Sequence, residues 1–228
     1  LSIMKRLNKN KGNIIENSVL DNFFIWAFIG IILGGRIGYV LIYQMNFFIE
    51  KPLYLFEIWN GGMSFHGGLL GTIASIYFFC KANNIKFFYL SDLVSVVAPI
   101  GLFLGRIANF INTELIGRPT DFYISVIYPS VDNLPRHPSQ IYEAIFEGLV
   151  LFLILIFYFK RKTNIQNYGM VSGLFLTWYS IFRFFIEFLR EPDSHLGLYF
   201  NFISMGQLIT IPFLLFGIIL TQRNGYKK

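Results

Sequence analysis

Apolar residues gather along the chain into six long segments separated by short polar stretches. The segments cover residues 23–43, 63–79, 93–111, 141–159, 170–189 and 203–220. Each is close to the roughly 20 residues that cross a bilayer as an α-helix. We therefore predict an all-α fold, a polytopic integral membrane bundle with six transmembrane helices. Residues 1–228 would form a single membrane domain.

The stretches between the segments differ in character. Residues 1–19 are polar and basic, which predicts an extramembrane tail. Residues 47–60 are amphipathic and rich in aromatic side chains, which is typical of a segment at the membrane interface. The longest polar connection, residues 112–138, contains four prolines and predicts a small extramembrane cap.

Composition supports a membrane protein and excludes several other classes. The chain is 54% hydrophobic and only 14% charged, whereas a soluble domain carries about 25% charged residues. A single cysteine, Cys80, excludes an intramolecular disulfide and a cysteine-based metal cluster. The net charge of +6 is expected to report membrane topology. We therefore expect no nucleic-acid partner.

Lysine and arginine are distributed unequally between alternate connections. Most of those outside the segments lie in the two tails and in the connections around residues 81–86 and 160–162. The alternate connections hold only Lys51, Arg118, Arg136 and Arg190. Because basic residues concentrate on the cytoplasmic side, both termini are predicted to be cytoplasmic.

Glycines recur at intervals of four within three of the segments. They are Gly30, Gly34 and Gly38, then Gly67 and Gly71, then Gly101 and Gly105. Small residues at this spacing let membrane helices approach closely. The pattern predicts close helix packing but says nothing about chemistry.

Ionisable side chains from five of the segments fall at one depth. With a rise of about 1.5 Å per residue, Arg106 lies roughly 20 Å beyond the cytoplasmic start of its segment. The same reasoning places a set of six in the outer half of the membrane: Arg36, His66, Arg106, Glu143, Glu147 and Arg183. Charged groups inside a membrane are costly and mark a functional site.

Helical spacing places several polar side chains on common faces. These are Tyr179, Arg183 and Glu187; Arg106 and Asn109; and Glu143 and Glu147. Two carboxylates as close as Glu143 and Glu147 would repel each other. They need arginine partners, or one of them must be protonated.

Structural interpretations compete with functional ones at three of these positions. Arg183 and Glu187 could form a structural ion pair, and Arg36 could fix its helix to its neighbours. His66 could be a hydrogen-bonded packing residue, although its glycine-rich setting GGMSFHGG permits close approach of a ligand.

His195, in a polar connection, is interpreted as solvated. No metalloprotease, serine-hydrolase, P-loop or dinucleotide motif is present, so we expect no metal, no cofactor and no covalent serine intermediate.

An arginine-rich pocket at this depth suits an anionic ligand. Guanidinium groups bind phosphate through bidentate, charge-assisted hydrogen bonds, and the abundant phosphates of a membrane are lipid head groups. A neighbouring histidine favours head-group chemistry. A lipid or anion transporter with an arginine-lined pocket is the alternative.

Residues 105–117 read GRIANFINTELIG and resemble the signature of the prolipoprotein diacylglyceryl transferase family. The signature positions that fit are Gly105, Arg106, Ala108, Asn109, Phe110, Asn112, Glu114 and Gly117. Further blocks resemble the family in the same order along the chain, at residues 34–43, 59–71, 136–143, 180–193 and 203–207.

The resemblance implies transfer of diacylglycerol from phosphatidylglycerol to the lipobox cysteine thiol of a prolipoprotein, the first step of bacterial lipoprotein maturation. A thioether forms and glycerol phosphate leaves. It implies a multi-pass protein of the bacterial inner membrane, with the tail of residues 1–19 in the cytoplasm. The active site and the cap of residues 112–138 would face the periplasm.

The resemblance also implies roles for individual residues. His66 is the candidate base, with Arg–Glu arrangements that steer the proton as the alternative, while Arg106 and Arg183 would hold the phosphate. The remaining expected site residues, which shape the site, bind substrate or orient Arg183, are Arg36, Asn109, Asn112, Glu114, Gly117, Glu143, Tyr179 and Glu187, of which Glu114 is also a catalytic candidate.

Family members carry seven spans, and the first contributes to the site. The resemblance implies that this chain begins after that span, in the basic loop that follows it. An inactive truncated homologue is therefore a further alternative.

Overall fold

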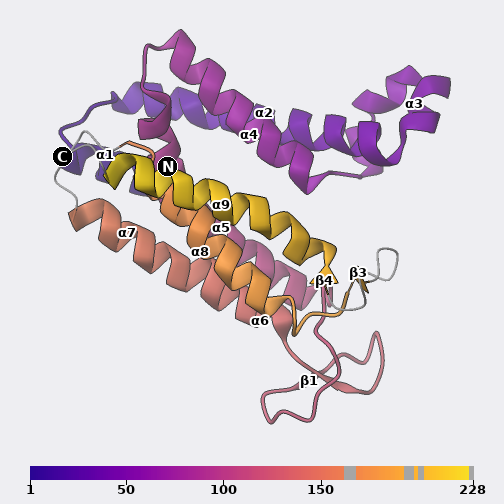
Figure 1. The fold of residues 1–228 in the computed structure, drawn as a ribbon. Coiled ribbons are helices and arrows are strands. Elements are labelled where there is room, and N and C mark those ends of the chain that lie inside the picture. The colour runs from indigo at the N-terminus through magenta and orange to yellow at the C-terminus, as the bar shows by residue number, and fades with distance from the viewer. Residues whose placement is uncertain (162–167, 193–197, 200–202, 226–228) are drawn as a thin grey trace. The chain divides into compact units, whose positions relative to one another are not determined.

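The computed structural model describes residues 1–161, 168–192, 198–199 and 203–225. Helices dominate this part of the chain (Figure 1). Two compact units, Leu1–Ser91 and Asp92–Lys228, are described separately below. His195 and its interpretation as a solvated residue lie outside the described residues.

The first unit is built around two long helices. Its elements are α1 (Ser2–Asn10), α2 (Asn17–Tyr43), α3 (Met45–Glu50), the short 3-10 helices η1 (Pro52–Phe56) and η2 (Ile58–Asn60), and α4 (Phe65–Ala82). Helices α2 and α4 lie side by side (Figure 1). The elements α3, η1 and η2 occupy the stretch expected at the membrane interface.

Glycines bring the backbones of α2 and α4 into direct contact. A Cβ atom added to Gly71 would lie 2.0 Å from the carbonyl oxygen of Gly30, and one added to Gly67 would lie 2.2 Å from that of Gly34. The close packing predicted from the glycine spacing is confirmed here. Among the described residues, Gly101 has no atom within 4 Å of such a Cβ, so the spacing does not produce the same contact there.

Replacing Gly71 with alanine is expected to destabilise the first unit. The added methyl group meets backbone atoms that cannot rotate away, and overpacking of this kind costs about 1–3 kcal/mol. Thermal unfolding of the protein in detergent measures the loss. Gly101→Ala is the matched control and should hold or raise stability, because alanine favours helix by about 1 kcal/mol. Equal unfolding temperatures for the two variants would contradict the packing argument.

Residues 1–19 are more ordered than a simple tail. They contain α1, whose Met4 and Leu7 side chains are buried. Asn8 is also buried and receives a hydrogen bond of 2.9 Å from the Tyr89 hydroxyl group. Met4 and Leu7 are three residues apart and give α1 a buried face. This face is not apparent from the sequence, because basic residues dominate the stretch.

The described part of the second unit contains the remaining helices and four short strands. Its elements are α5 (Phe87–Ile111, which begins in the first unit), β1 (Val126–Ile127), β2 (Pro135–Arg136), α6 (Ser139–Glu143), η3 (Ala144–Val150), α7 (Leu151–Arg161), α8 (Met170–Ile186), β3 (Leu198–Tyr199), β4 (Ile203–Ser204) and α9 (Met205–Gly225). Strands β1 and β2 pair antiparallel within the predicted cap, and β3 pairs with β4. These hairpins are small additions to a helical fold.

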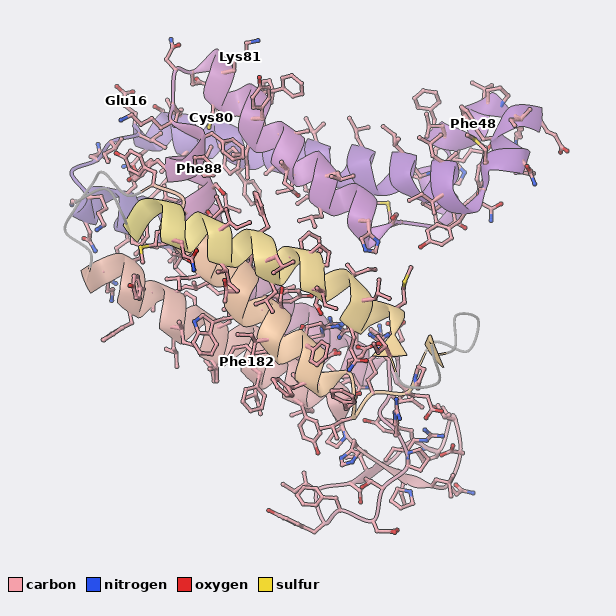
Figure 2. The ribbon with its side chains drawn as sticks, viewed as in Figure 1. Glu16, Phe48, Cys80, Lys81, Phe88 and Phe182 are labelled. Atoms are coloured by element: carbon pink, nitrogen blue, oxygen red, sulfur yellow. The ribbon has the colours of Figure 1, made fainter. Side chains whose placement is uncertain are left out.

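Helix α8 is held by neighbours at both its ends. It lies along α9 (Figure 1). At its start, the Asp92 carboxylate of α5 accepts hydrogen bonds from the Ser172 amide and hydroxyl groups, both at 2.7 Å, and from the Gly169 amide at 2.8 Å. These bonds satisfy amide groups that have no partner within the helix. Further along, the ring of Phe182 (Figure 2) lies 5.6 Å from that of Phe146 in η3.

Four helical stretches of the described chain are long and apolar enough to cross a membrane. They are Asn17–Tyr43, Phe87–Ile111, Ser139–Lys160 and Met205–Gln222. The other two predicted spans are also helical: α4 has 18 residues but carries His66 and Lys81 near its ends, and α8 is apolar with 17 residues. A mostly helical fold with four candidate membrane spans among the described residues is therefore confirmed.

Candidate active site

Two arginines and three glutamates from four elements form a buried cluster in the second unit. Arg106 of α5 places Nε 3.0 Å from Glu143 Oε2 and Nη2 3.4 Å from Glu147 Oε2. Arg183 of α8 binds Glu143 through Nη1, which also lies 3.8 Å from Glu147 Oε1. Its Nη2 is 2.8 Å from Glu187 Oε2. Sequence spacing alone had placed these five residues at one depth or on common faces.

The cluster resolves the repulsion expected between Glu143 and Glu147. Both side chains are 0% exposed, and each faces both Arg106 and Arg183. Burying charges is favourable only when their partners are well placed. Glu147 lies in η3, a seven-residue π-helix, and such segments are frequent at functional sites.

Two further side chains contact Glu187, and neither contact is predicted from the sequence. Arg190 Nη1 lies 3.9 Å from Glu187 Oε2, and the Ser204 hydroxyl group donates to Glu187 Oε1 at 2.9 Å. The spacing of Arg190, three residues after Glu187 and seven after Arg183, was a usable signal. Ser204 gave no such signal. Tyr179 lies one turn before Arg183, and its ring stacks on Phe175 with centroids 5.9 Å apart.

The signature stretch turns sharply where α5 ends. The Glu114 amide donates to the Asn109 carbonyl oxygen at 2.9 Å, and the Asn109 side chain donates to Glu114 Oε2 at 2.9 Å. Thr113 and Leu115 have φ values of 58° and 55°. Residues other than glycine rarely adopt this region, and β-branched ones very rarely. Such strain costs on the order of 1–3 kcal/mol per residue and is concentrated at functional sites.

The end of the signature is packed against the chain that leads into α6. Gly117 is buried, and a Cβ atom there would lie 2.2 Å from the His137 carbonyl oxygen. Asn112, by contrast, is exposed at the start of the turn. The glycine at position 117 is therefore required by close backbone approach, whereas Asn112 is open to a ligand.

Arg136 joins two parts of the cap to the segment that follows α8. Its guanidinium group donates to Asp132 at 2.6 Å and to the Gly117 carbonyl oxygen at 3.0 Å, and it binds the Glu191 carboxylate. The hydrogen bond from Arg136 lowers the pKa of the Asp132 carboxyl group below its usual 3.8.

Stability of the cap is expected to depend on pH through Asp132. Because the pKa is lowered in the folded protein, the carboxylate stabilises the cap fully above about pH 4, and this contribution is lost as the pH falls through the lowered value. Hydrogen-exchange protection factors for residues 126–136 should therefore hold from pH 7 to pH 5 and decline below pH 4. Asp132→Asn should lower protection at pH 7 and flatten the decline. An unchanged profile in that variant would contradict this role.

Comparison with known proteins identifies the chain. The sequence profile described as prolipoprotein diacylglyceryl transferase matches residues 1–223. The chain belongs to the prolipoprotein diacylglyceryl transferase family. It is 54% identical over 205 residues to the phosphatidylglycerol–prolipoprotein diacylglyceryl transferase of Pseudoalteromonas atlantica, covering 88% of this chain and 72% of that protein. The transferase of the same name from Vibrio atlanticus is 50% identical over 227 residues, covering 98% and 82%. That of Rickettsia akari is 50% identical over 214 residues, covering 93% and 82%.

In this diacylglyceryl transferase family member, Arg36 makes contacts that differ from those of Arg106 and Arg183. Its guanidinium group donates to the carbonyl oxygens of Tyr54 at 2.6 Å and Leu55 at 3.1 Å, and also to that of Gly61. The guanidinium carbon lies 4.6 Å from the centre of the Tyr54 ring. These contacts hold the segment between α2 and α4 against Arg36. Substrate binding by Arg36 remains a prediction.

His66, the candidate base of the transferase, lies in the first turn of α4 and is exposed. The Ser64 hydroxyl group caps this helix by accepting from the Gly67 amide at 3.3 Å. His66 and Arg36 belong to the first unit, which is described by itself, so their place beside Arg106 and Arg183 remains a prediction.

Proposed function

We propose that this transferase moves the diacylglyceryl group of phosphatidylglycerol to the lipobox cysteine thiol of prolipoproteins. The bond between the glyceryl carbon and the phosphate oxygen breaks, a carbon–sulfur bond forms, and glycerol phosphate leaves. The observation that carries the proposal is the pairing of Arg106 and Arg183 around shared carboxylates in a chain of this family. Two adjacent guanidinium groups suit a phosphate that gains charge as it departs.

Each residue of the site has its own proposed role in the reaction. Arg106 and Arg183 exchange part of their contact with Glu143 and Glu147 for the lipid phosphate. The substrate thiol must lose its proton, because the thiolate is the nucleophile. His66 takes this proton, and the departing phosphate is the final acceptor. The other substrate contacts come from Asn109, Asn112, Glu114 and Gly117 at the turn, from Tyr179 and Glu187 beside Arg183, and from Glu143 and Arg36.

We propose that the protein lies in the bacterial inner membrane with six of its helices crossing the bilayer. Helices α4 and α8 join the four longer apolar stretches as spans. Both termini are cytoplasmic, because the basic residues concentrate in the tails and in the connections on their side. The cap of residues 112–138 and the site then face the periplasm. The whole chain acts as one membrane domain and needs no metal or cofactor.

Reconstitution tests this function directly. The chain is placed in vesicles containing phosphatidylglycerol with a radiolabelled glyceryl backbone, and a lipobox peptide is added. The expected product is labelled peptide that resists alkaline hydrolysis, as a thioether does. Labelled lipid that crosses the bilayer while the peptide stays unlabelled would instead support the transporter alternative. If neither labelled peptide nor lipid transport is detected, the result would support the inactive-homologue alternative.

The same assay tests His66. Its replacement with glutamine keeps hydrogen-bonding capacity but removes the base, so turnover should fall by about 100-fold. Arg6→Gln, at an exposed position in α1, is the control and should turn over at the parental rate. Full turnover by His66→Gln would remove His66 from the role of base.

A further inference from the structure

Four successive backbone carbonyl groups at the end of the signature each accept a hydrogen bond from a distant part of the second unit. Gln140 Nε2 donates to the Glu114 oxygen at 2.6 Å, and the Ser139 hydroxyl group donates to the Leu115 oxygen at 2.9 Å. The remaining two donors are the Glu191 amide, 3.1 Å from the Ile116 oxygen, and Arg136 Nη1, 3.0 Å from the Gly117 oxygen.

These bonds hold a backbone that would not keep its shape alone. Thr113 and Leu115 both occupy the left-handed region, and a conformation of this kind persists only where its surroundings enforce it. The two donors nearest the strained residues are Ser139 and Gln140. Both are 0% exposed, so water cannot replace either one.

Gln140 is itself held in one orientation. Its Oε1 accepts a hydrogen bond of 3.1 Å from the hydroxyl group of Tyr128, a residue that is 4% exposed. With Oε1 occupied in this way, Nε2 is directed at the Glu114 carbonyl oxygen. Three residues after Gln140, at the other end of the short helix α6, Glu143 binds Arg106 and Arg183. One helix therefore connects the turn to the buried cluster.

We propose that Ser139 and Gln140 form a carbonyl clamp that fixes the strained turn and thereby positions the Glu114 carboxylate. Both are positioning residues, acting through the backbone of Glu114 and Leu115. The clamp keeps Glu114 Oε2 at its 2.9 Å hydrogen bond with the Asn109 side chain. The consequence for catalysis rests on the proposed transferase function.

A double-mutant cycle in the lipidation assay tests positioning. Gln140→Leu retains much of the side-chain volume and removes both hydrogen bonds, and losing a buried partner of this kind should lower kcat by about tenfold. KM for the peptide should stay within about twofold. If Gln140 acts through Glu114, the same change made in a Glu114→Gln background should cost less than about twofold more. Losses that simply multiply would overturn the proposal.

A second experiment relieves the backbone strain at Leu115. Glycine adopts the left-handed region without penalty, so Leu115→Gly lowers the demand on the clamp. Added to Gln140→Leu, it should recover at least about threefold of the lost kcat. No recovery would contradict the idea that the clamp opposes backbone strain.

A third experiment uses a spin label and does not depend on turnover. The only cysteine is Cys80, so a full-length Cys80→Ala, Glu114→Cys protein can be spin-labelled at position 114. Adding Gln140→Leu should increase the mobility of the label, whereas Thr221→Val should not. That control removes a comparable hydrogen bond, from the Thr221 hydroxyl group to the Ile218 carbonyl oxygen at 2.7 Å in α9.

These experiments distinguish failure of the carbonyl clamp from failure of the proposed transferase function. If the parental protein lipidates no peptide, the proposed function fails, and the label still decides whether the clamp exists. Equal label mobility with and without Gln140 would overturn the clamp even in an active enzyme.

Discussion

Replacing Arg183 with glutamine is expected to abolish lipidation and to destabilise the protein. Arg183 is the shared partner of Glu143, Glu147 and Glu187. Its removal leaves buried carboxylates without enough positive charge, which costs about 3–5 kcal/mol. Loss of the proposed phosphate-binding group should lower kcat by a further factor of about 10²–10³. Thermal unfolding and the labelled-lipid assay measure the two effects separately.

A second substitution separates stability from chemistry. Glu187→Gln, combined with Arg183→Gln, removes one of the carboxylates that Arg183 paired with, so part of the lost stability should return. Turnover should stay absent, because the phosphate-binding group is still missing. Recovery of turnover along with stability would show that Arg183 serves only as an ion-pair partner, the structural alternative that the sequence left open.

Replacing Gly117 with alanine is expected to be the most damaging single-methyl change in the cap. The new Cβ would lie 2.2 Å from the His137 carbonyl oxygen and 2.7 Å from the His137 Cβ atom. The backbone must move apart, at a cost of about 1–3 kcal/mol. That movement also stretches the hydrogen bond from Arg136, and it disturbs the antiparallel backbone pairing of Gly117 with Arg190. Lipidation should fall by about 100-fold or more, since a displacement near 1 Å can cost that much.

Gly101→Ala serves as the control for this effect. Its added methyl group meets no described atom within 4 Å, so the lipidation rate should be that of the parental protein. Comparable losses in the two variants would mean that glycine content, and not the contact with His137, explains the result.

The sequence predicted the features that depend on periodicity. Segment length identified the helices, and a rise per residue was enough to bring Arg106 and Arg183 together with Glu143 and Glu147. The same spacing rule connected Arg183 to Glu187 and could have added Arg190. These predictions succeed because an apolar helix fixes both the depth and the direction of each side chain.

Features that depend on the path of the chain between helices were not predicted. Ser139 and Gln140 bind backbone carbonyl groups about 25 residues earlier, and backbone acceptors leave no mark in the sequence. The capping of α8 by Asp92 is not predicted either, because the backbone amide donors that Asp92 binds leave no mark in the sequence. Helix α1, within the predicted tail, is not predicted because its basic residues outnumber the two apolar ones that it buries.

Helices α5 and α8 are fastened to each other at two widely separated levels. Asp92 and Ser172 join them at one level, while Arg106 and Arg183 meet on Glu143 at the other. The two fastenings are 14 residues apart along α5, or roughly 21 Å at the rise of an α-helix. Two attachments this far apart limit the sliding and rotation of α5 against α8. If Arg106 and Arg183 bind the lipid phosphate as proposed, we expect their side chains to rotate toward it while the two helices keep their places.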